Sequence, residues 1–116
     1  MSLDICKYPF EKDLLGSQHH VYYNKYHNGG GPYLLNNFIK DYKFPKFNSV
    51  MEFCSGPGFI GYYLMHKYKL ADVHLVDINP EVKLGIELTN KENNWNGYFY
   101  ESDALENYNG PKVDFI

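Results

Sequence analysis

The sequence contains no arginine, and all eleven of its basic residues are lysines. These lysines are scattered along 116 residues with a net charge of −3, which does not indicate phosphate-driven binding of nucleic acid by this chain alone. The two cysteines, Cys6 and Cys54, show neither metal-binding nor redox spacing and fit a reducing compartment. No apolar run approaches the roughly 18 residues of a membrane span, and no signal peptide is visible. We therefore expect a soluble, cytoplasmic domain.

The apolar content of 44% is enough for a folded core, and it follows alternating strand and helix patterns. We predict strands at 50–53, 72–77 and 97–100 with a fourth beginning at 112–116, and helices at 32–42, 59–69 and 79–92. Strands that alternate with helical stretches of about 10–15 residues indicate a parallel sheet with right-handed crossovers. The sequence therefore predicts an α/β fold with a Rossmann-like parallel sheet and helices on both faces.

The beginning of the chain fits this pattern poorly. It is polar and aromatic, and it ends in the glycine-rich stretch Asn28–Gly31, which we predict to be a flexible joint. One short helix is expected around Phe10–Leu15. The histidines of this segment have no partner cysteine cluster, so we predict no metal site. We divide the chain into a leading segment, 1–31, and an α/β domain, 32–116.

The stretch Ser49–Gly61 carries the strongest functional signal. It predicts a strand that runs into a glycine turn and then into a helix. Gly56 and Gly58 stand where the chain must turn, and the acidic residue Glu52 lies near the end of the strand. Glycines let the main chain approach a ligand closely, and the start of a helix offers free N–H groups. A nucleotide-type cofactor needs this geometry.

Acidic residues follow successive predicted strands. Glu52 lies at the end of the first strand, Asp77 at the end of the second and Asp103 just after the third, with Asp114 in the fourth. In open parallel sheets, ligands bind beyond the carboxyl ends of the strands. We therefore expect these acids to converge on a single pocket.

One interpretation of this pocket is a dinucleotide site. The residues from Gly56 to Gly61 match G-x-G-x-x-G, and Asp77 lies about twenty residues further on, where a ribose-binding acid is expected. Against it stands Glu52, because the positions before the first glycine of that fingerprint are apolar strand core and a charge there is costly to bury. A single G-x-G-x-x-G is also a weak signal.

The other interpretation rests on a family resemblance that runs from about Ser49 to the end of the chain. Met51–Gly58 resembles the first motif of class I S-adenosylmethionine-dependent methyltransferases, Val76–Ile78 their second and Ser102–Ala104 their third. Val113–Ile116 looks like the opening of their fourth strand. The order of the motifs is closest to the methyltransferases of planar nitrogens, which act on release-factor glutamine or on adenine.

This resemblance implies a cofactor site made by Glu52, Cys54, Gly56, Gly58, Asp77, Ile78, Asp103 and Ala104. Glu52 would supply negative charge near the ammonium group of S-adenosylmethionine, and the two glycines would let the main chain pass close to its methionine and ribose portions. Cys54 stands where the family most often has its first glycine, and we expect it to be a buried small residue.

The resemblance also assigns the adenosine end of the cofactor. Asp77 would accept two hydrogen bonds from the ribose diol, a charge-assisted arrangement. Ile78 would lie on one face of the adenine. Asp103 would accept from the adenine amino group, and the N–H of Ala104 would donate to a ring nitrogen.

The family's sheet is larger than the sheet predicted here. We expect about four strands in the spatial order 3-2-1-4, which leaves an apolar edge at Val113–Ile116 that could mediate self-association. The Asn-Pro-Pro-aromatic sequence that holds the target nitrogen in the planar-nitrogen subgroup is absent, so catalytic residues are not predicted. We expect the isolated chain to lack methyl transfer. The acceptor stays open between protein, nucleic acid and small molecule, and a non-catalytic interaction module is the alternative.

Overall fold

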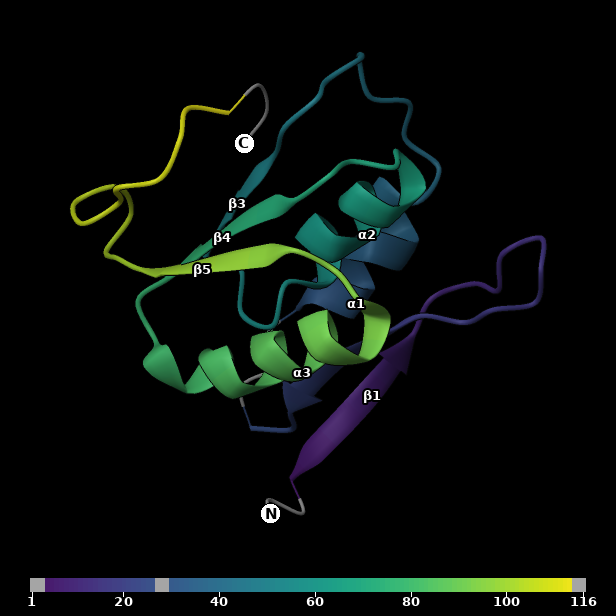
Figure 1. Ribbon diagram of the computed structural model, residues 1–116, viewed down its shortest axis with the longest axis horizontal. Coiled ribbons are helices and arrows are strands. Elements are labelled where there is room, and N and C mark those ends of the chain that lie inside the picture. The colour runs from purple at the N-terminus through teal and green to yellow at the C-terminus, as the bar shows by residue number, and fades with distance from the viewer. Residues whose placement is uncertain (1–3, 27–29, 114–116) are drawn as a thin grey trace.

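The computed structural model describes residues 4–26 and 30–113. Its centre is a three-stranded parallel sheet in the order β3-β4-β5 (Figure 1). The strands are β3 (Met51–Phe53), β4 (Val73–Asp77) and β5 (Gly97–Glu101). This confirms the predicted α/β class and the 3-2-1 order of the first three strands. The predicted fourth strand lies outside the described residues except for its start, so the apolar edge stays a prediction.

Two crossover helices connect these strands, as predicted. They are α2 (Phe59–Lys67) and α3 (Lys83–Asn93), the latter preceded by a 3-10 turn, η2 (Pro80–Val82). Asn79 begins η2, and its side chain accepts a hydrogen bond from the N–H of Glu81 at 3.0 Å, as expected of a helix cap. In the described part of the chain, both crossover helices pack on the same face of the sheet, and Tyr62 of α2 reaches Ile86 and Asn90 of α3.

The core lies between this face and the two helices. Val73 and Leu75 of β4 are fully buried together with Phe59 and Tyr62 of α2 and Ile86 of α3. Four consecutive residues of β4 are buried, as is typical of a central parallel strand. The hydroxyl of Tyr62 donates to Asn90 Oδ1 at 2.6 Å, and burial raises the pKa of this hydroxyl, so it stays a donor.

Asn90 connects α3 to the third strand of the sheet. Its side-chain amide donates to the carbonyl oxygen of Gly97 at 2.8 Å, and its Oδ1 accepts from the Gly97 N–H at 2.8 Å. Both main-chain groups at the start of β5 are therefore paired with one side chain.

The leading segment forms an antiparallel hairpin of β1 (Ile5–Pro9) and β2 (His20–Asn24), and the helix predicted around Phe10–Leu15 is wrong. Residues 10–19 are the loop of the hairpin. Asp13 Oδ1 accepts hydrogen bonds from the N–H groups of Leu15 and Ser17, both at 2.9 Å. Such local side-chain bonds compete with helix formation and favour a turn.

The hairpin packs on α3 through the edge of β2 that is not paired with β1. The N–H of Tyr22 donates to Thr89 Oγ1 at 2.8 Å, and Asn93 pairs with both the N–H and the carbonyl oxygen of His20, at 3.3 and 2.7 Å. Gly85, one turn before Thr89, allows the close approach, because a Cβ there would lie 2.6 Å from the carbonyl oxygen of Tyr22. A helix thus completes the hydrogen bonds of a strand edge.

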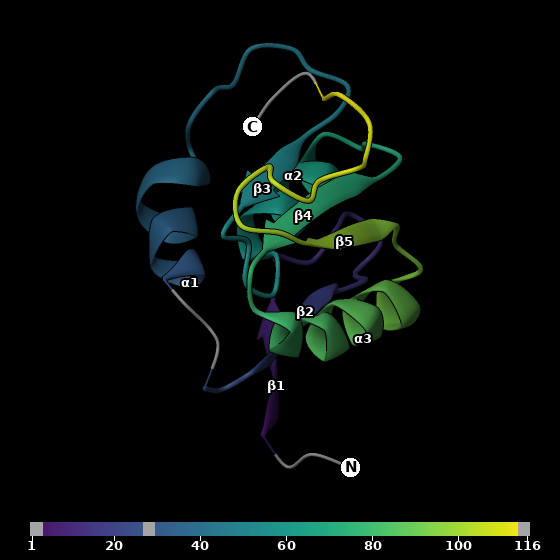
Figure 2. The same cartoon turned by 90° about the vertical axis from the view of Figure 1, so that its left-hand side faces the viewer.

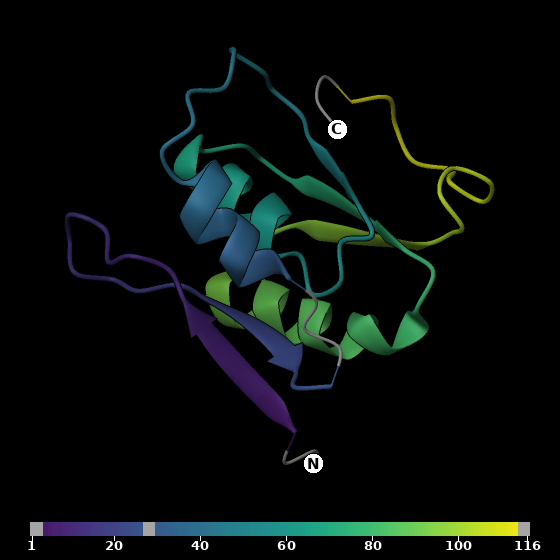
Figure 3. The same cartoon turned by 180° about the vertical axis from the view of Figure 1, so that it is seen from behind.

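The helix predicted at 32–42 is shorter than expected. It consists of α1 (Gly31–Leu34), with Pro32 in its first turn, and a π-helical turn, η1 (Leu35–Ile39). The predicted joint at Asn28–Gly31 lies largely outside the described residues. Seen from behind, α1 lies across α2, and β1 forms the outer edge of the hairpin (Figure 3). Figure 2 shows α3 and the hairpin together below the sheet, with α1 to one side of it.

Candidate cofactor site

The glycine turn after β3 has the predicted form. Cys54, Gly56 and Gly58 have φ angles of 49°, 52° and 90°, so the chain enters the left-handed region three times within five residues. Glycine adopts this region without strain. The N–H of Gly58 donates to the Ser55 carbonyl at 2.9 Å, and α2 begins at the next residue.

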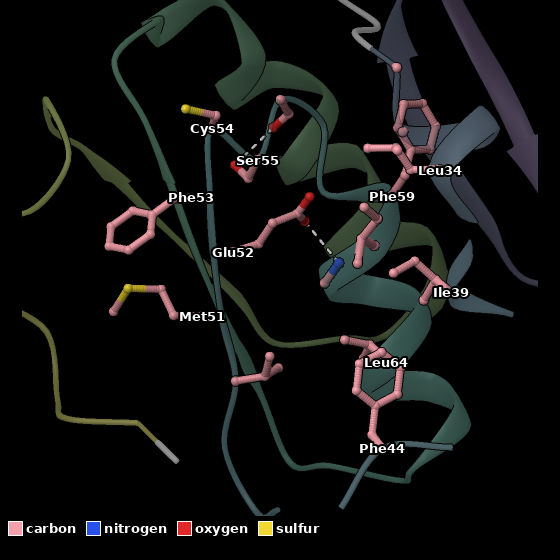
Figure 4. A pocket seen from close by; sticks show the side chains of 16 residues that line it. Leu34, Ile39, Phe44, Met51, Glu52, Phe53, Cys54, Ser55, Phe59 and Leu64 are labelled. Atoms are coloured by element: carbon pink, nitrogen blue, oxygen red, sulfur yellow. Dashed lines mark hydrogen bonds between the residues drawn. The ribbon is translucent and has the colours of Figure 1, made fainter. Parts of the chain in front are cut away.

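Glu52 reaches from the middle of β3 to the first turn of α2. Its Oε1 accepts a hydrogen bond from the N–H of Gly61 at 2.8 Å (Figure 4). Helix starts carry free N–H groups and partial positive charge, so a carboxylate is favourable there. Burial, together with the nearby Asp77, nevertheless raises the pKa of Glu52 to about 8, against the lowering effect of the Gly61 bond. The carboxyl group is therefore mostly protonated at neutral pH until a cation approaches it.

A cavity of about 540 Å³ lies between this carboxyl group, the glycine turn and the α1–η1 segment. Most of its wall is apolar, and Glu52 is the only Asp or Glu among the described residues that line it. Leu34, Ile39 and Phe44 close the side opposite β3, whereas Met51 and Phe53 point to the other side of the strand (Figure 4). The cavity could hold a largely apolar group with one cationic end.

The carboxylate of Asp77 accepts hydrogen bonds from two main-chain N–H groups, one in the glycine turn and one just after β4. Its Oδ2 accepts from the N–H of Gly56 at 2.8 Å and its Oδ1 from the N–H of Asn79 at 2.9 Å. Each carboxylate oxygen can accept more than one hydrogen bond, so both can still accept from a ligand hydroxyl. The glycine turn is also tied to β4 by the N–H of Ser55, which donates to the Val76 carbonyl at 3.1 Å.

A second cavity, of about 160 Å³, gathers the residues of the second and third sequence motifs. Its lining consists of Phe53, Cys54, Val76, Asp77, Ile78, Ser102, Asp103 and Ala104. Ile78 is 65% exposed, and Asp103 and Ala104 are exposed as well, so their side chains and main chain are open to a ligand. The segment is held by the N–H of Ser102, which donates to the Asp77 carbonyl at 3.0 Å.

The structure brings seven of the eight predicted residues to one edge of the sheet, where they line two adjoining cavities and not the single pocket expected. Glu52 and Gly56 line the first cavity, Asp77, Ile78, Asp103 and Ala104 line the second, and Cys54 lines both. Gly58 lines neither cavity, and its φ of 90° lets the chain turn into α2.

The expectation that Cys54 is buried is wrong. Its side chain is exposed, because the left-handed φ of 49° at the end of β3 turns it out between the two cavities.

Sequence reasoning missed several residues of the site. Phe53 and Ser102 line the second cavity, and both stand directly beside predicted site residues, so sequence position could have suggested them. Leu34, Ile39 and Phe44 come from the segment before β3. The helical spacing of Leu34 and Ile39 was visible in the sequence, and Phe44 was predicted in the turn that follows, but the position of all three against the glycine turn depends on packing.

The glycine turn and the parallel strands, with acids at their carboxyl ends, define a Rossmann-like fold, a class in which ligands bind beyond those strand ends. A family model described as methyltransferase small domain matches residues 14–116, which is most of the chain. The chain therefore belongs to the methyltransferase small domain family, within the class I S-adenosylmethionine-dependent methyltransferases. A search of curated proteins found no match.

Two further findings concern membranes and metals. Within residues 4–26 and 30–113, no helix has the length and apolar character needed to cross a membrane. In the same part of the chain, no group of three or more histidine, cysteine, aspartate or glutamate residues is arranged to hold a metal ion.

Proposed function

We propose that this chain binds S-adenosylmethionine at the carboxyl edge of its sheet and forms the cofactor-binding part of a methyltransferase. The observation that carries the proposal is the pair of adjoining cavities, which share Phe53 and Cys54 and have different acids on their walls. A ligand that crosses from one to the other needs a cationic group at one end and hydroxyl groups near the middle. S-adenosylmethionine has this order of groups.

The residues present fit this cofactor. Glu52 is a partly buried carboxyl group whose pKa is raised by burial, and an ammonium group in the first cavity would favour its ionised form. Asp77 is held in place by Gly56 and Asn79 and keeps acceptor capacity for a ribose diol. Ile78 offers an exposed apolar surface to the adenine, next to Asp103 and the N–H of Ala104.

The chain's own residues act by binding and orientation. S-adenosylmethionine supplies an activated methyl group, which an acceptor takes by in-line attack, so the rate depends on how well the two reactants are positioned. Glu52 and Asp77 would fix the ammonium end and the ribose of the cofactor relative to the glycine turn. The apolar wall formed by Leu34, Ile39 and Phe44 would limit the access of water to the methionine end.

The same geometry weighs against a dinucleotide. A pyrophosphate needs the free N–H groups and positive potential of the helix start after the glycine turn. Here the N–H of Gly61 already donates to Glu52, and a carboxyl group lies where the phosphates would come. This favours a cofactor with a positive end over one with a diphosphate.

The order of the motifs favours a planar nitrogen of a protein or a nucleic acid as the methyl acceptor. We propose that this chain alone binds the cofactor without transferring its methyl group, because the subgroup's Asn-Pro-Pro-aromatic sequence is absent.

Isothermal titration of the full chain with S-adenosylmethionine and S-adenosylhomocysteine tests the proposal, with NAD as a control ligand. We expect binding of the first two and no binding of NAD. The Asp77→Ala variant should lose binding. Absence of binding by the parent chain, or equal binding by Asp77→Ala, would overturn the proposal.

A further inference from the structure

His74 is a buried titratable residue outside both cavities. Its neighbours in β4, Val73 and Leu75, face α2, because a Cβ at Gly61 would lie 3.0 Å from Val73 Cγ2 and 2.8 Å from Leu75 Cδ2. Side chains alternate along a strand, so His74 faces the opposite side of the sheet. Its side chain is 5% exposed. A buried imidazole needs partners for its nitrogens.

Both nitrogens of His74 have such partners. Nδ1 lies 2.9 Å from the hydroxyl oxygen of Tyr100, and Nε2 lies 3.4 Å from Asp72 Oδ1. The ring also stacks on Tyr98, with centroids 5.5 Å apart, and on Tyr100, with centroids 5.8 Å apart. The imidazole is therefore fixed between the start of β4 and two residues of β5.

The direction of the Tyr100 bond follows from the chemistry of the two groups. Burial raises the pKa of Tyr100, and Tyr108 and Asp72 raise it further, so the hydroxyl keeps its proton. Because the Asp72 carboxylate beside Nε2 can only accept, the proton of the neutral imidazole lies on Nε2, and Nδ1 accepts from the Tyr100 hydroxyl. Because the phenol is not ionised, this arrangement does not make Tyr100 a nucleophile or a base. It holds the phenol in place.

Tyr100 in turn contacts the segment that follows β5, drawn in yellow in Figure 1. Its ring centroid lies 4.7 Å from that of Tyr108. The main chain at Gly110 passes so close that a Cβ there would lie 2.6 Å from the hydroxyl oxygens of both tyrosines. The same segment begins with Ser102, Asp103 and Ala104, which line the second cavity.

We propose that His74 is a positioning residue of the cofactor site: by accepting the Tyr100 hydrogen bond it holds residues 102–113 against the sheet, with Asp103 and Ala104 beside the second cavity. Its effect on binding rests on the proposed function, whereas its effect on the segment does not. A second proton on the imidazole turns Nδ1 into a donor and removes the acceptor of the Tyr100 hydroxyl.

The groups that face this ring determine how it responds to pH. Asp72 is the carboxylate beside Nε2, at 3.4 Å. Tyr98 and Tyr100 of β5 face the ring, and Tyr108 lies behind Tyr100. From β3 the neighbour in register is Met51, which does not titrate. The segment should loosen when the ring gains a second proton, because Nδ1 then carries a hydrogen and no longer accepts from the Tyr100 hydroxyl.

Hydrogen exchange of the full chain tests the positioning directly. The N–H groups of Glu106, Asn107 and Tyr108 all donate within the segment, and their protection can be followed at about pH 5.5 and pH 8 after correction for intrinsic exchange. In the parent chain, protection should be lower at the acidic pH. Tyr100→Phe should lower it at both values, and Tyr98→Phe, which removes a hydroxyl that does not bond His74, should behave like the parent.

The variant His74→Asn separates positioning from packing. The asparagine oxygen can accept the Tyr100 hydrogen bond from about the position of Nδ1, but it cannot be protonated. We expect protection equal to that of the parent at pH 8 and no loss at pH 5.5. Unchanged protection in Tyr100→Phe, or a parent-like pH response in His74→Asn, would overturn the proposal. If His74→Asn does not fold, Tyr100→Phe decides alone.

Affinity for S-adenosylmethionine supplies a second measurement. At pH 8, Tyr100→Phe should bind about three- to tenfold more weakly than the parent, as expected for the loss of one hydrogen bond, and His74→Asn should bind within about twofold. Glu52 titrates in all variants, so differences between their pH profiles isolate His74. If the parent does not bind, the proposed function fails and the exchange result still decides the positioning. If Tyr100→Phe binds like the parent, the positioning fails and the proposed function stands.

Discussion

Asp77 Oδ2 accepts a hydrogen bond from the main-chain N–H of Gly56 at 2.8 Å, joining the end of β4 to the glycine turn after β3. The two residues are 21 positions apart in the sequence, and each belongs to a different motif of the family. The turn is therefore held in its shape by the same carboxylate that would receive the ribose.

This double role predicts that Asp77 contributes to both stability and binding. Asp77→Asn keeps one acceptor but turns an NH₂ group toward one of the two main-chain N–H groups. We expect the free energy of unfolding to fall by about 1–2 kcal/mol, and S-adenosylmethionine to bind at least tenfold more weakly. Urea unfolding and calorimetry measure the two effects.

Asp103→Asn is the matched control, because Asp103 is exposed and lines only the second cavity. It should weaken binding and leave stability within about 0.5 kcal/mol of the parent. Equal stability losses in the two variants would contradict a special role for the bond between Asp77 and Gly56.

The raised pKa of Glu52 predicts that stability decreases as the pH rises. The native state holds the Glu52 proton up to about pH 8, whereas the unfolded chain releases it near pH 4.3. Between these values the native state binds more protons, so the free energy of unfolding falls with increasing pH and levels off above about pH 8. Water reaches part of this carboxyl group, so we expect a loss on the order of 2 kcal/mol.

Glu52→Gln tests this behaviour, because it keeps the acceptor for the Gly61 N–H and cannot ionise. Near pH 4.5 the variant and the parent should have similar stability, and above pH 8 the variant should be the more stable of the two. Denaturant unfolding across this range gives the comparison. A parent whose Glu52-dependent stability rises with pH would show that the carboxyl group is instead ionised in the native state.

Under the proposed function, cofactor binding should release a proton from Glu52. At pH 7 the carboxyl group is mostly protonated in the free chain, and an ammonium group beside it favours the ionised form. Titration calorimetry in two buffers with different ionisation enthalpies should therefore report the release of up to about one proton per cofactor bound. Glu52→Gln should bind without this release, and a parent with the same heat in both buffers would rule the coupling out.

The contact between β2 and α3 predicts that Thr89 stabilises the whole chain. Thr89→Val preserves the shape of the side chain but leaves the Tyr22 N–H without its acceptor and removes the hydroxyl that donates to the Gly85 carbonyl. We expect a loss of about 1–3 kcal/mol, measured by urea unfolding. Lys91→Ala, at an exposed position of the same helix, should change stability by less than about 0.5 kcal/mol. A similar effect of both changes would mean that the hydrogen bond between Thr89 and β2 does not stabilise the chain.

Local chemistry explains which parts of this fold the sequence could predict. The alternation of apolar runs with helix signals such as Asn79-Pro80 was sufficient for β3, β4, β5 and the crossover helices. The glycine turn was predictable because Gly56 and Gly58 adopt conformations that other residues avoid. The acids at the strand ends converge because parallel strands end at the same edge of a sheet.

The other features depend on contacts between distant residues. The segment around Phe10–Leu15 has apolar residues at helical spacing, but it closes a hairpin because β1 pairs with β2 and Asp13 forms a local turn. The recognition of β2 by Gly85, Thr89 and Asn93 cannot be read from a helix pattern alone. Neither can the contact of His74 with Tyr100, which arises only when β4 and β5 pair.

Asn90 and Asn93 connect α3 to both sheets of the chain. An asparagine side chain is itself an amide, with a donor and an acceptor placed as in a peptide group, and each of these two residues pairs with both main-chain groups of one strand residue. Asn90 pairs with Gly97 of the parallel sheet, and Asn93 pairs with His20 of the hairpin. One helix thus supplies an additional pair of hydrogen bonds to each of two separate sheets. When α3 unfolds, both sheets lose these hydrogen bonds at once. The parallel sheet and the hairpin should therefore unfold in one transition and not in succession.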